Sequence, residues 1–206
     1  MSAVHRRAIL HLKRADAALG RAIARVGPCR FAPQTDGTHF DFIIKSIVYQ
    51  QLSGKAAATI HRRVLELFAG AGATPHSVAA VKDQRLREAG LSRQKASYLK
   101  DLALKVDAGE VRLGGIESAA DEDALAELTK VKGIGRWSAQ MFLMFRLGRP
   151  DILPEGDLGI RKAVQQVYGL RRLPSPERVR RIGRPWSPHA TIASWYLWRH
   201  LDGPAG

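Results

Sequence analysis

The chain has 206 residues, of which 45% are hydrophobic and 25% charged, proportions typical of a globular protein rather than a disordered one. Its 33 Lys and Arg residues outnumber 19 Asp and Glu residues, which gives a formal net charge of +14. Such an excess favours a polyanionic partner, because side chains that neutralise phosphates release condensed counterions; a basic protein without such a partner is the alternative.

The cysteine, histidine and hydropathy patterns exclude further classes. Cys29 is the single cysteine, so neither an intramolecular disulfide nor a cluster held by several thiolates can form. The 7 histidines are scattered without metal-ligand spacing, and we expect no catalytic metal. No apolar run is long enough to span a membrane and the N-terminus does not resemble a secretory signal, so we expect a cytoplasmic protein.

Helical periodicity dominates the chain from end to end. In chain order it predicts helices at 3–26, 40–51, 55–68, from Thr74-Pro75 onward, at 83–89, 92–108 and 121–129, from 136 and 158 onward, and around the aromatic C-terminal segment. In that last helix we expect Trp195, Tyr196 and Trp198 to lie in the core. No stretch alternates apolar and polar residues for long enough to predict a strand. The fold class predicted is all-α, with a subdomain crossing near Gly114-Gly115.

A Gly-Ile-Gly turn lies between two of these helical patterns. Gly133 and Gly135 allow positive φ and close approach of the backbone to a ligand, and Ile134 can fill the space between the helices. The helix that follows points its positive end at an anion. Side chains that can add phosphate contacts follow the same turn: Lys132, Arg136 and Ser138. This pattern predicts a phosphate-binding hairpin, and a plain helical corner closed by glycine is the alternative.

Asp157 follows a loop containing Pro154, Glu155 and Gly156 and precedes a helical pattern. A helix N-cap is its simplest role, and that position also favours the ionised carboxylate. Near a sugar, a carboxylate can stabilise an oxocarbenium-like charge and orient or deprotonate an incoming water. The two roles are compatible.

The hairpin and the loop with its aspartate resemble the helix-hairpin-helix (HhH-GPD) DNA glycosylase superfamily. Within it the chain is similar to the bacterial 3-methyladenine DNA glycosylase II group and its yeast relatives, which residues 47–57 and the segment from Arg184 to Trp195 also match. The similarity runs from about residue 40 to 201. It implies two helical subdomains flanking a DNA-binding cleft: 39–147, ending in the helix-hairpin-helix at about 121–147, and 148–206, on which residues 1–38 pack.

The resemblance makes Asp157 the catalytic aspartate. Members that also nick the strand carry at position 137 a lysine that forms a Schiff base with the sugar, whereas this chain has Trp137. We therefore expect a monofunctional enzyme that leaves an abasic strand intact. Lys132 is a less favoured substitute nucleophile because it lies on the phosphate-facing turn.

Aromatic side chains are expected to bind the damaged base. Trp137 and Trp186 can stack on a base made cationic by alkylation, each contact being worth about 0.5–2 kcal/mol. By analogy with the family, Met141 and Leu158 stand where bulkier aromatics often occur, which predicts a roomier pocket.

The segment around Gln51 ends a helical pattern and is the expected wedge. Extruding a base costs a few kcal/mol, and a side chain that fills the gap offsets part of that cost. The resemblance assigns the wedge to Gln51, with Leu52 and Ser53 beside it on the DNA; a polar helix end is the alternative. The arginines between Arg171 and Arg184 can follow the DNA backbone or form a solvated face, and no role is assigned to them.

The predicted function is hydrolysis of the N-glycosidic bond of alkylated purines, such as 3-methyladenine and 7-methylguanine, flipped out of duplex DNA to initiate base excision repair. A non-enzymatic helix-hairpin-helix DNA-binding module and a glycosylase/lyase for oxidised bases are the alternatives. We expect a monomer acting on double-stranded DNA with damaged bases and no catalytic cofactor, while allowing for a monovalent cation on the hairpin carbonyls. The chain is too short and too helical for the N-terminal β-rich domain of well-known bacterial members.

Overall fold

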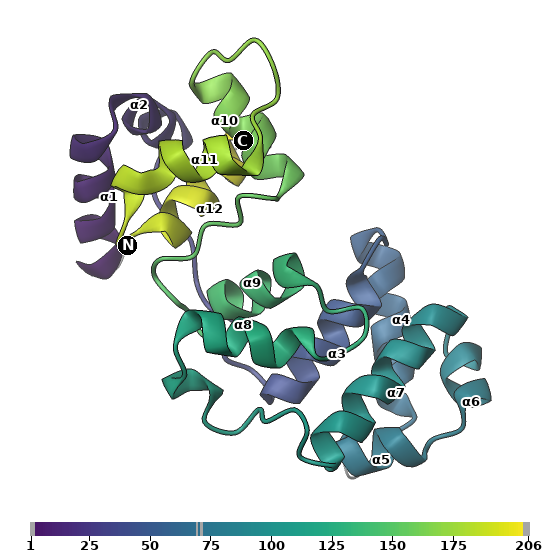
Figure 1. Ribbon diagram of the computed structural model, residues 1–206. Coiled ribbons are helices and arrows are strands. Elements are labelled where there is room, and N and C mark those ends of the chain that lie inside the picture. Colours follow the sequence, from purple (N-terminus) through teal and green to yellow (C-terminus); the bar gives the residue numbers. More distant parts are fainter. Residues whose placement is uncertain (1–2, 69, 71, 204–206) are drawn as a thin grey trace. The chain divides into compact units, whose positions relative to one another are not determined.

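The computed structural model of this chain describes residues 3–68, 70 and 72–203, and every regular element in that part is helical (Figure 1). The predicted all-α fold is confirmed. The chain divides into two compact units: unit 1 comprises residues 1–34 and 143–206, and unit 2 comprises residues 35–142. The predicted segments were 1–38, 39–147 and 148–206, of which residues 1–2 and 204–206 lie outside the described part.

Unit 2 is built around its longest helix. Its elements are α3 (His39–Tyr49), α4 (Gly54–Glu66), α5 (Pro75–Ala80), α6 (Asp83–Glu88), α7 (Arg93–Asp107), η1 (Ile116–Ser118), α8 (Asp121–Thr129) and most of α9 (Arg136–Phe145). Helix α7 packs against α3, α5 and α6, and Ile44, Ile47 and Leu99 are fully buried between these elements. Thr38 and Thr74 begin α3 and α5 with capping boxes, which explains why the sequence pattern predicts these helix starts closely.

Unit 1 brings the two ends of the chain together. It contains α1 (Ala3–Ala15), α2 (Ala17–Val26), α10 (Leu158–Val167), α11 (Pro176–Gly183), η2 (Arg184–Trp186) and α12 (Ala190–Leu201). Helix α12 packs against α1, α2 and α10, so the purple N-terminal helices lie beside the yellow C-terminal one (Figure 1). The fully buried core includes Leu12, Leu19 and Tyr196.

Three sequence predictions about these elements are wrong. The single helix predicted for 3–26 is two helices, because Asp16 takes extended backbone angles and caps α2 by accepting a hydrogen bond from Leu19 N at 3.0 Å. Helix α11 was not predicted, although Ser175 as N-cap and Pro176 in the first turn signal its start. Gly114 and Gly115 lie inside unit 2 rather than at a crossing. No helix in the described residues is long and apolar enough to cross a membrane.

Candidate functional site

The turn between α8 and α9 depends on one of its two glycines. Gly133 has a φ of +79°, and a Cβ placed on it would lie 2.2 Å from Tyr98 Cδ2, so a side chain does not fit. Gly135 does not have a positive φ, and a Cβ placed on it would meet nothing within 4 Å. The prediction of positive φ at both glycines is therefore wrong for Gly135. Ile134 is buried between the helices, where it was expected.

Two polar groups of this hairpin have partners in unit 2. The Lys132 backbone N–H donates to Asp101 Oδ2 at 2.8 Å. The Arg136 guanidinium forms a fork with Glu122, with N–O distances of 2.8 and 3.0 Å. Both side chains of that pair are exposed, where an ion pair contributes little to stability. The positive end of α9 lies at the same turn.

The turn after α3 presents the predicted wedge. In the described part of the chain, Gln51 is the one non-glycine residue with positive φ, 57°, a conformation that costs such a residue about 1–2 kcal/mol. Its side chain is exposed, and the neighbouring Leu52 is 40% exposed. Ser53 stands at the N-cap of α4, but its hydroxyl makes no capping hydrogen bond.

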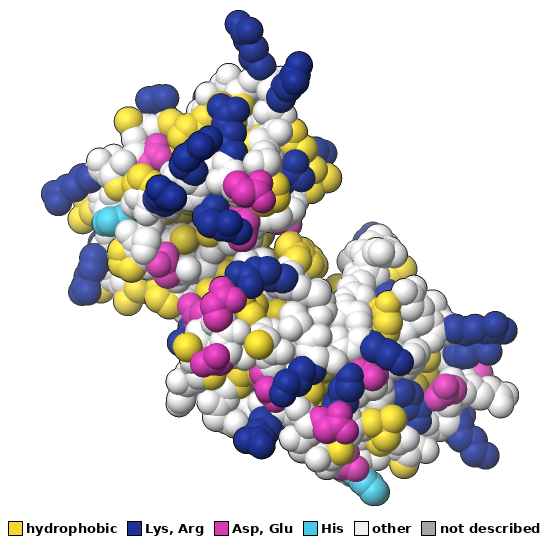
Figure 2. Space-filling model, in the orientation of Figure 1, with side chains coloured by type: hydrophobic (Ala, Val, Ile, Leu, Met, Phe, Trp, Pro, Cys, Tyr) yellow, Lys and Arg dark blue, Asp and Glu magenta, His cyan; other side chains and the backbone are white. Residues whose placement is uncertain are grey.

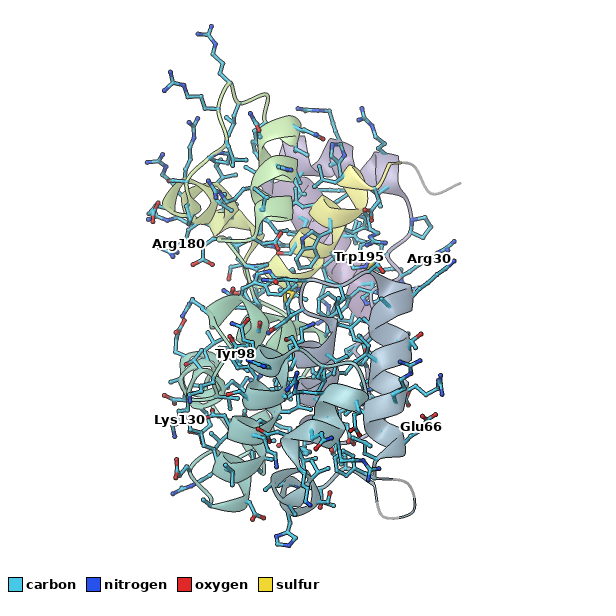
Figure 3. The ribbon with its side chains drawn as sticks, turned by 90° about the vertical axis from the view of Figure 1, so that its right-hand side faces the viewer. Arg30, Glu66, Tyr98, Lys130, Arg180 and Trp195 are labelled. Atoms are coloured by element: carbon cyan, nitrogen blue, oxygen red, sulfur yellow. The ribbon has the colours of Figure 1, made fainter. Side chains whose placement is uncertain are left out.

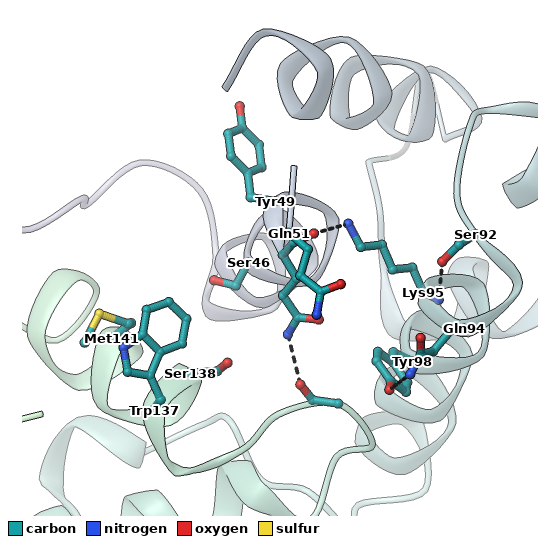
Figure 4. Close-up of a pocket in the computed structure, with 12 residues that line it drawn as sticks. Ser46, Tyr49, Gln51, Ser92, Gln94, Lys95, Tyr98, Trp137, Ser138 and Met141 are labelled. Atoms are coloured by element: carbon teal, nitrogen blue, oxygen red, sulfur yellow. Dashed lines mark hydrogen bonds between the residues drawn. The ribbon is translucent and has the colours of Figure 1, made fainter. Parts of the chain in front are cut away.

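Hydrogen bonds to two other elements, the hairpin and α7, support this turn (Figure 4). Gln50 Nε2 donates to the Gly133 carbonyl oxygen at 2.9 Å, which ties the wedge turn to the hairpin. Lys95 Nζ, on α7, donates to the carbonyl oxygens of Val48 at 2.7 Å and Gln50 at 2.5 Å. The hairpin and the wedge turn are thereby linked by hydrogen bonds within unit 2.

A pocket of about 720 Å³ opens among these elements. Trp137, Ser138 and Met141 line one side of it and Gln94, Lys95 and Tyr98 the other (Figure 4). The remaining lining residues are Ser46, Tyr49, Gln50, Gln51, Ser92 and Gly133. The Trp137 side chain is 49% exposed, so its ring is accessible. Gly133, Gln51, Trp137, Ser138 and Met141 are thus brought together, whereas the contributions of α7 were missed because that helix carries no motif.

The predicted catalytic acid lies in unit 1, at the start of α10. Asp157 Oδ1 accepts hydrogen bonds from Ile160 N at 2.7 Å and from Trp198 Nε1 at 2.9 Å. The first is the expected N-cap. The second was not predicted: Trp198 packs against the core of unit 1, as expected, but its partly exposed indole also donates to the carboxylate and orients it. Leu158, the next residue, is 52% exposed.

Two acids in the same loop differ in environment. Glu155 is buried, and its Oε1 accepts a hydrogen bond from Arg180 Nη2 at 2.5 Å (Arg180 is labelled in Figure 3). Asp157 is partly exposed and caps a helix. Of the two acids, Asp157 is therefore the more accessible.

Trp186 is not available to stack on a base, and that prediction is wrong. Its side chain is 0% exposed, and its Nε1 donates to Asp16 Oδ2 at 3.0 Å. The Tyr168 hydroxyl donates to the same carboxylate, and burial together with Asp16 raises the pKa of Tyr168 well above its usual value. Trp195 is partly exposed and precedes Trp198 by three positions on α12, so both indoles lie toward one side of that helix (Figure 3 labels Trp195).

The arginines between Arg171 and Arg184, to which the sequence assigns no role, form a cationic surface on unit 1 (Figure 2). They are exposed, and those on or next to α11 gather over that helix: Arg178, Arg180, Arg181 and Arg184. Arg171 and Arg172 lie in the exposed loop before it. In the residues that the structure describes, no three His, Cys, Asp or Glu side chains are grouped so that they could hold a metal ion.

Comparison with known proteins identifies one family whose match includes the wedge turn, the hairpin and the loop with Asp157. The family model "HhH-GPD superfamily base excision DNA repair protein" matches residues 44–188. The alkylbase DNA glycosidase-like protein mag2 of Schizosaccharomyces pombe is 29% identical over 198 residues, covering 95% of this chain and 93% of the relative. DNA-3-methyladenine glycosylase 1 of the same yeast is 30% identical over 202 residues, with 94% and 86% covered.

Solved structures agree with the sequence relatives. The structure of Schizosaccharomyces pombe 3-methyladenine DNA glycosylase Mag1 in complex with abasic DNA superposes with a TM-score of 0.82 at 30% identity. The match covers 93% of this chain and 95% of that one.

Proposed function

Because the chain belongs to the HhH-GPD superfamily of base excision DNA repair proteins, we propose that it is a monofunctional DNA glycosylase acting on alkylated purines. The proposed substrates are 3-methyladenine, 7-methylguanine and related bases in double-stranded DNA, and the proposed working unit is a monomer. The names of the relatives support the substrate class, and the bound DNA of the Mag1 structure supports the partner. The observation that carries the proposal is the oriented carboxylate of Asp157 in the loop matched by the family.

The proposed reaction is hydrolysis at the anomeric carbon. Alkylation leaves a positive charge on the base, so the electron pair of the C1′–N bond departs with the base, which becomes neutral. The sugar left behind is oxocarbenium-like, and the Asp157 carboxylate stabilises its charge. Water then adds to C1′ and loses its proton to that carboxylate or to solvent. Hydrogen bonds from Ile160 N and Trp198 Nε1 would keep the carboxylate in one orientation throughout.

Strand cleavage is left out of the proposal because position 137 has no amine. An indole cannot form the Schiff base on which a glycosylase/lyase depends. Trp137 is accessible at the start of α9 and would instead stack on the cationic base. Met141, on the same helix, would add to this contact, whereas the buried Trp186 is left out of the proposal and Leu158 stays a prediction as a base contact.

The DNA contacts proposed for unit 2 use the hairpin and the wedge turn. The backbone around Gly133 and Gly135, with Lys132, Arg136 and Ser138, would hold phosphates, and Gln51 with Leu52 and Ser53 would enter the duplex. A monovalent cation on the hairpin carbonyls remains a prediction. The carbonyl oxygens of Lys130 and Gly133 already accept hydrogen bonds from Lys105 Nζ at 2.6 Å and Gln50 Nε2 at 2.9 Å.

The proposal is tested with Asp157→Asn. Asparagine caps helices as well as aspartate does, so the variant should fold, yet it carries no negative charge. We expect single-turnover release of 7-methylguanine to fall by about 10²–10³-fold, while affinity for a duplex with an abasic analogue changes little. A parental rate in this variant would rule out the assignment of Asp157.

Asp151 supplies a matched control in the same unit. Its carboxylate accepts hydrogen bonds from Ala190 N at 3.1 Å and Ser187 Oγ at 2.5 Å, so Asp151→Asn perturbs another structural acid. It should keep the parental rate. If the parental chain itself binds duplex DNA but releases no alkylated base, the non-enzymatic DNA-binding alternative replaces the enzyme.

A further inference from the structure

The end of α3 needs partners that its own sequence does not supply. The last carbonyls of an α-helix have no intrahelical partner, and a glycine at the left-handed position usually closes the end. Here that position is Gln51, with φ 57°. The local backbone bonds are long: Gln50 N to Ile47 O is 3.4 Å and Leu52 N to Tyr49 O is 3.3 Å.

Lys95 provides the missing donors from a distant part of the chain. Its Nζ lies 2.7 Å from Val48 O and 2.5 Å from Gln50 O, and the ammonium therefore sits at the negative end of α3. The backbone that carries this side chain is also fixed, because Lys95 N donates to the N-cap hydroxyl of Ser92 at 3.2 Å. Partial burial lowers the pKa of Lys95, in keeping with an ammonium held against protein rather than solvent.

We infer that Lys95 is a positioning residue for base extrusion: by bonding the carbonyls on either side of Tyr49, it holds Gln51 in the conformation that points the wedge outward. The inference rests on the proposed function and adds to it a residue outside the helix-hairpin-helix motif. The second brace, from Gln50 Nε2 to Gly133 O, fixes the same turn from the hairpin side. The lysine acts through the turn and need not touch DNA.

The chain contains a matched control for this role. Lys100 lies on the same helix, and its Nζ donates to the carbonyl oxygens of Ala79, at 2.7 Å, and Val81 at the end of α5. Lys100→Met therefore removes an ammonium that caps a helix end, as Lys95→Met does, but the helix end is not the one that carries the wedge. Both variants should lose similar thermal stability.

The experiment compares single-turnover base release from a lesion in a stable pair with release from the same lesion opposite a mismatched base. A mismatched base is easier to extrude, so it needs the wedge less. We expect Lys95→Met to slow release from the paired lesion about tenfold and from the mismatched lesion by less than about twofold. Lys100→Met should release both at the parental rate. Equal slowing of the two substrates by Lys95→Met, or equal effects of the two variants, would overturn the inference.

Salt dependence separates positioning from direct phosphate contact. If Lys95 held a phosphate, Lys95→Met would reduce the slope of log K against log[salt] by about one for undamaged duplex. An unchanged slope is expected, and a reduced one would assign the ammonium to DNA instead. Should Lys95→Met fail to fold, Lys95→Arg, which keeps the charge but has a bulkier head, should show the same selectivity for the mismatch in milder form; a parental ratio would contradict the inference.

A direct probe of the wedge makes the result independent of catalysis. A duplex with 2-aminopurine next to a tetrahydrofuran abasic analogue brightens when a side chain disturbs the stacking of the fluorophore. Bound parental protein should raise the fluorescence, Lys95→Met should raise it much less at saturation, and Lys100→Met should match the parent. If the parental chain releases no base, the proposed function fails, while this measurement still decides whether Lys95 positions the wedge.

Discussion

The two units hold their candidate functional groups by opposite means. In unit 1 the group is a side chain, Asp157, oriented by the N–H groups of Ile160 and Trp198. In unit 2 the groups lie on two turns, the hairpin and the wedge turn, whose backbone is held by side chains such as Lys95 and Gln50. Substitutions that disturb unit 1 should therefore change the rate of base release, and those that disturb unit 2 should change DNA binding and base extrusion.

Two aspartates of unit 1, Asp16 and Asp157, have similar surroundings and can be compared directly. Asp16 and Asp157 each cap a helix and each accept a hydrogen bond from a tryptophan Nε1, Trp186 at 3.0 Å and Trp198 at 2.9 Å. The first pair is completed by the Tyr168 hydroxyl and contains a fully buried indole, whereas the second contains a partly exposed one. The same set of hydrogen bonds is therefore enclosed around Trp186 and accessible at Trp198, and the burial of the indole makes the difference.

The largest effect is expected at the hairpin, from Gly133→Ala. The new methyl group would meet the Tyr98 ring at 2.2 Å and the residue would keep a φ of +79°. Overpacking and left-handed strain together should lower the free energy of unfolding by about 2–4 kcal/mol. Gly135→Ala, where nothing lies within 4 Å, should change it by less than about 0.5 kcal/mol.

Denaturant unfolding and titration with undamaged duplex check this pair of variants. Gly133→Ala should also bind the duplex more weakly even where it is fully folded, because the turn itself contacts phosphate in the proposed function. Equal stability and affinity in the two variants would show that the hairpin does not depend on a residue without a side chain at position 133.

An intermediate effect is expected from Trp198→Phe, which removes the indole N–H that bonds Asp157. Loss of one orienting hydrogen bond, about 1.4 kcal/mol in the transition state, should slow single-turnover base release about tenfold with little change in duplex affinity. Trp186→Phe, in the buried pair, should lower the melting temperature more and leave the rate of the folded protein near the parental value. The reverse pattern would mean that the two aspartates have been assigned the wrong roles.

The smallest effect is expected from Glu122→Gln in unit 2. The substitution removes the carboxylate that pairs with Arg136, at 2.8 and 3.0 Å, and so leaves the guanidinium available to phosphate. Since an exposed ion pair contributes at most about 1 kcal/mol, affinity for undamaged duplex should rise about two- to threefold at low salt and return to the parental value at high salt. Unchanged affinity at low salt would indicate that Arg136 does not reach DNA.

Local sequence determined the helical elements and the motifs. The helix at Asp121–Thr129 was predicted with the bounds that it has, and the starts at Thr38 and Thr74 follow from hydroxyl caps within three residues of their partners. The capping role of Asp157 is also local, whereas the Tyr98 ring that excludes a side chain at Gly133 comes from α7. The helix bounds and the caps depend on contacts within a turn or two of helix, so a single sequence contains enough information to predict them.

Only the tertiary structure distinguishes side chains of the same type, such as the tryptophans and the lysines, and so decides the role of each. Trp186 and Trp198 look alike in the sequence, but one is buried against Asp16 and the other reaches Asp157 across 41 residues. Lys95 meets Val48 across 47 residues, and no local pattern distinguishes it from other lysines of the chain. Burial and long-range hydrogen bonds arise when helices distant in sequence pack together, and periodicity within one helix does not specify that packing.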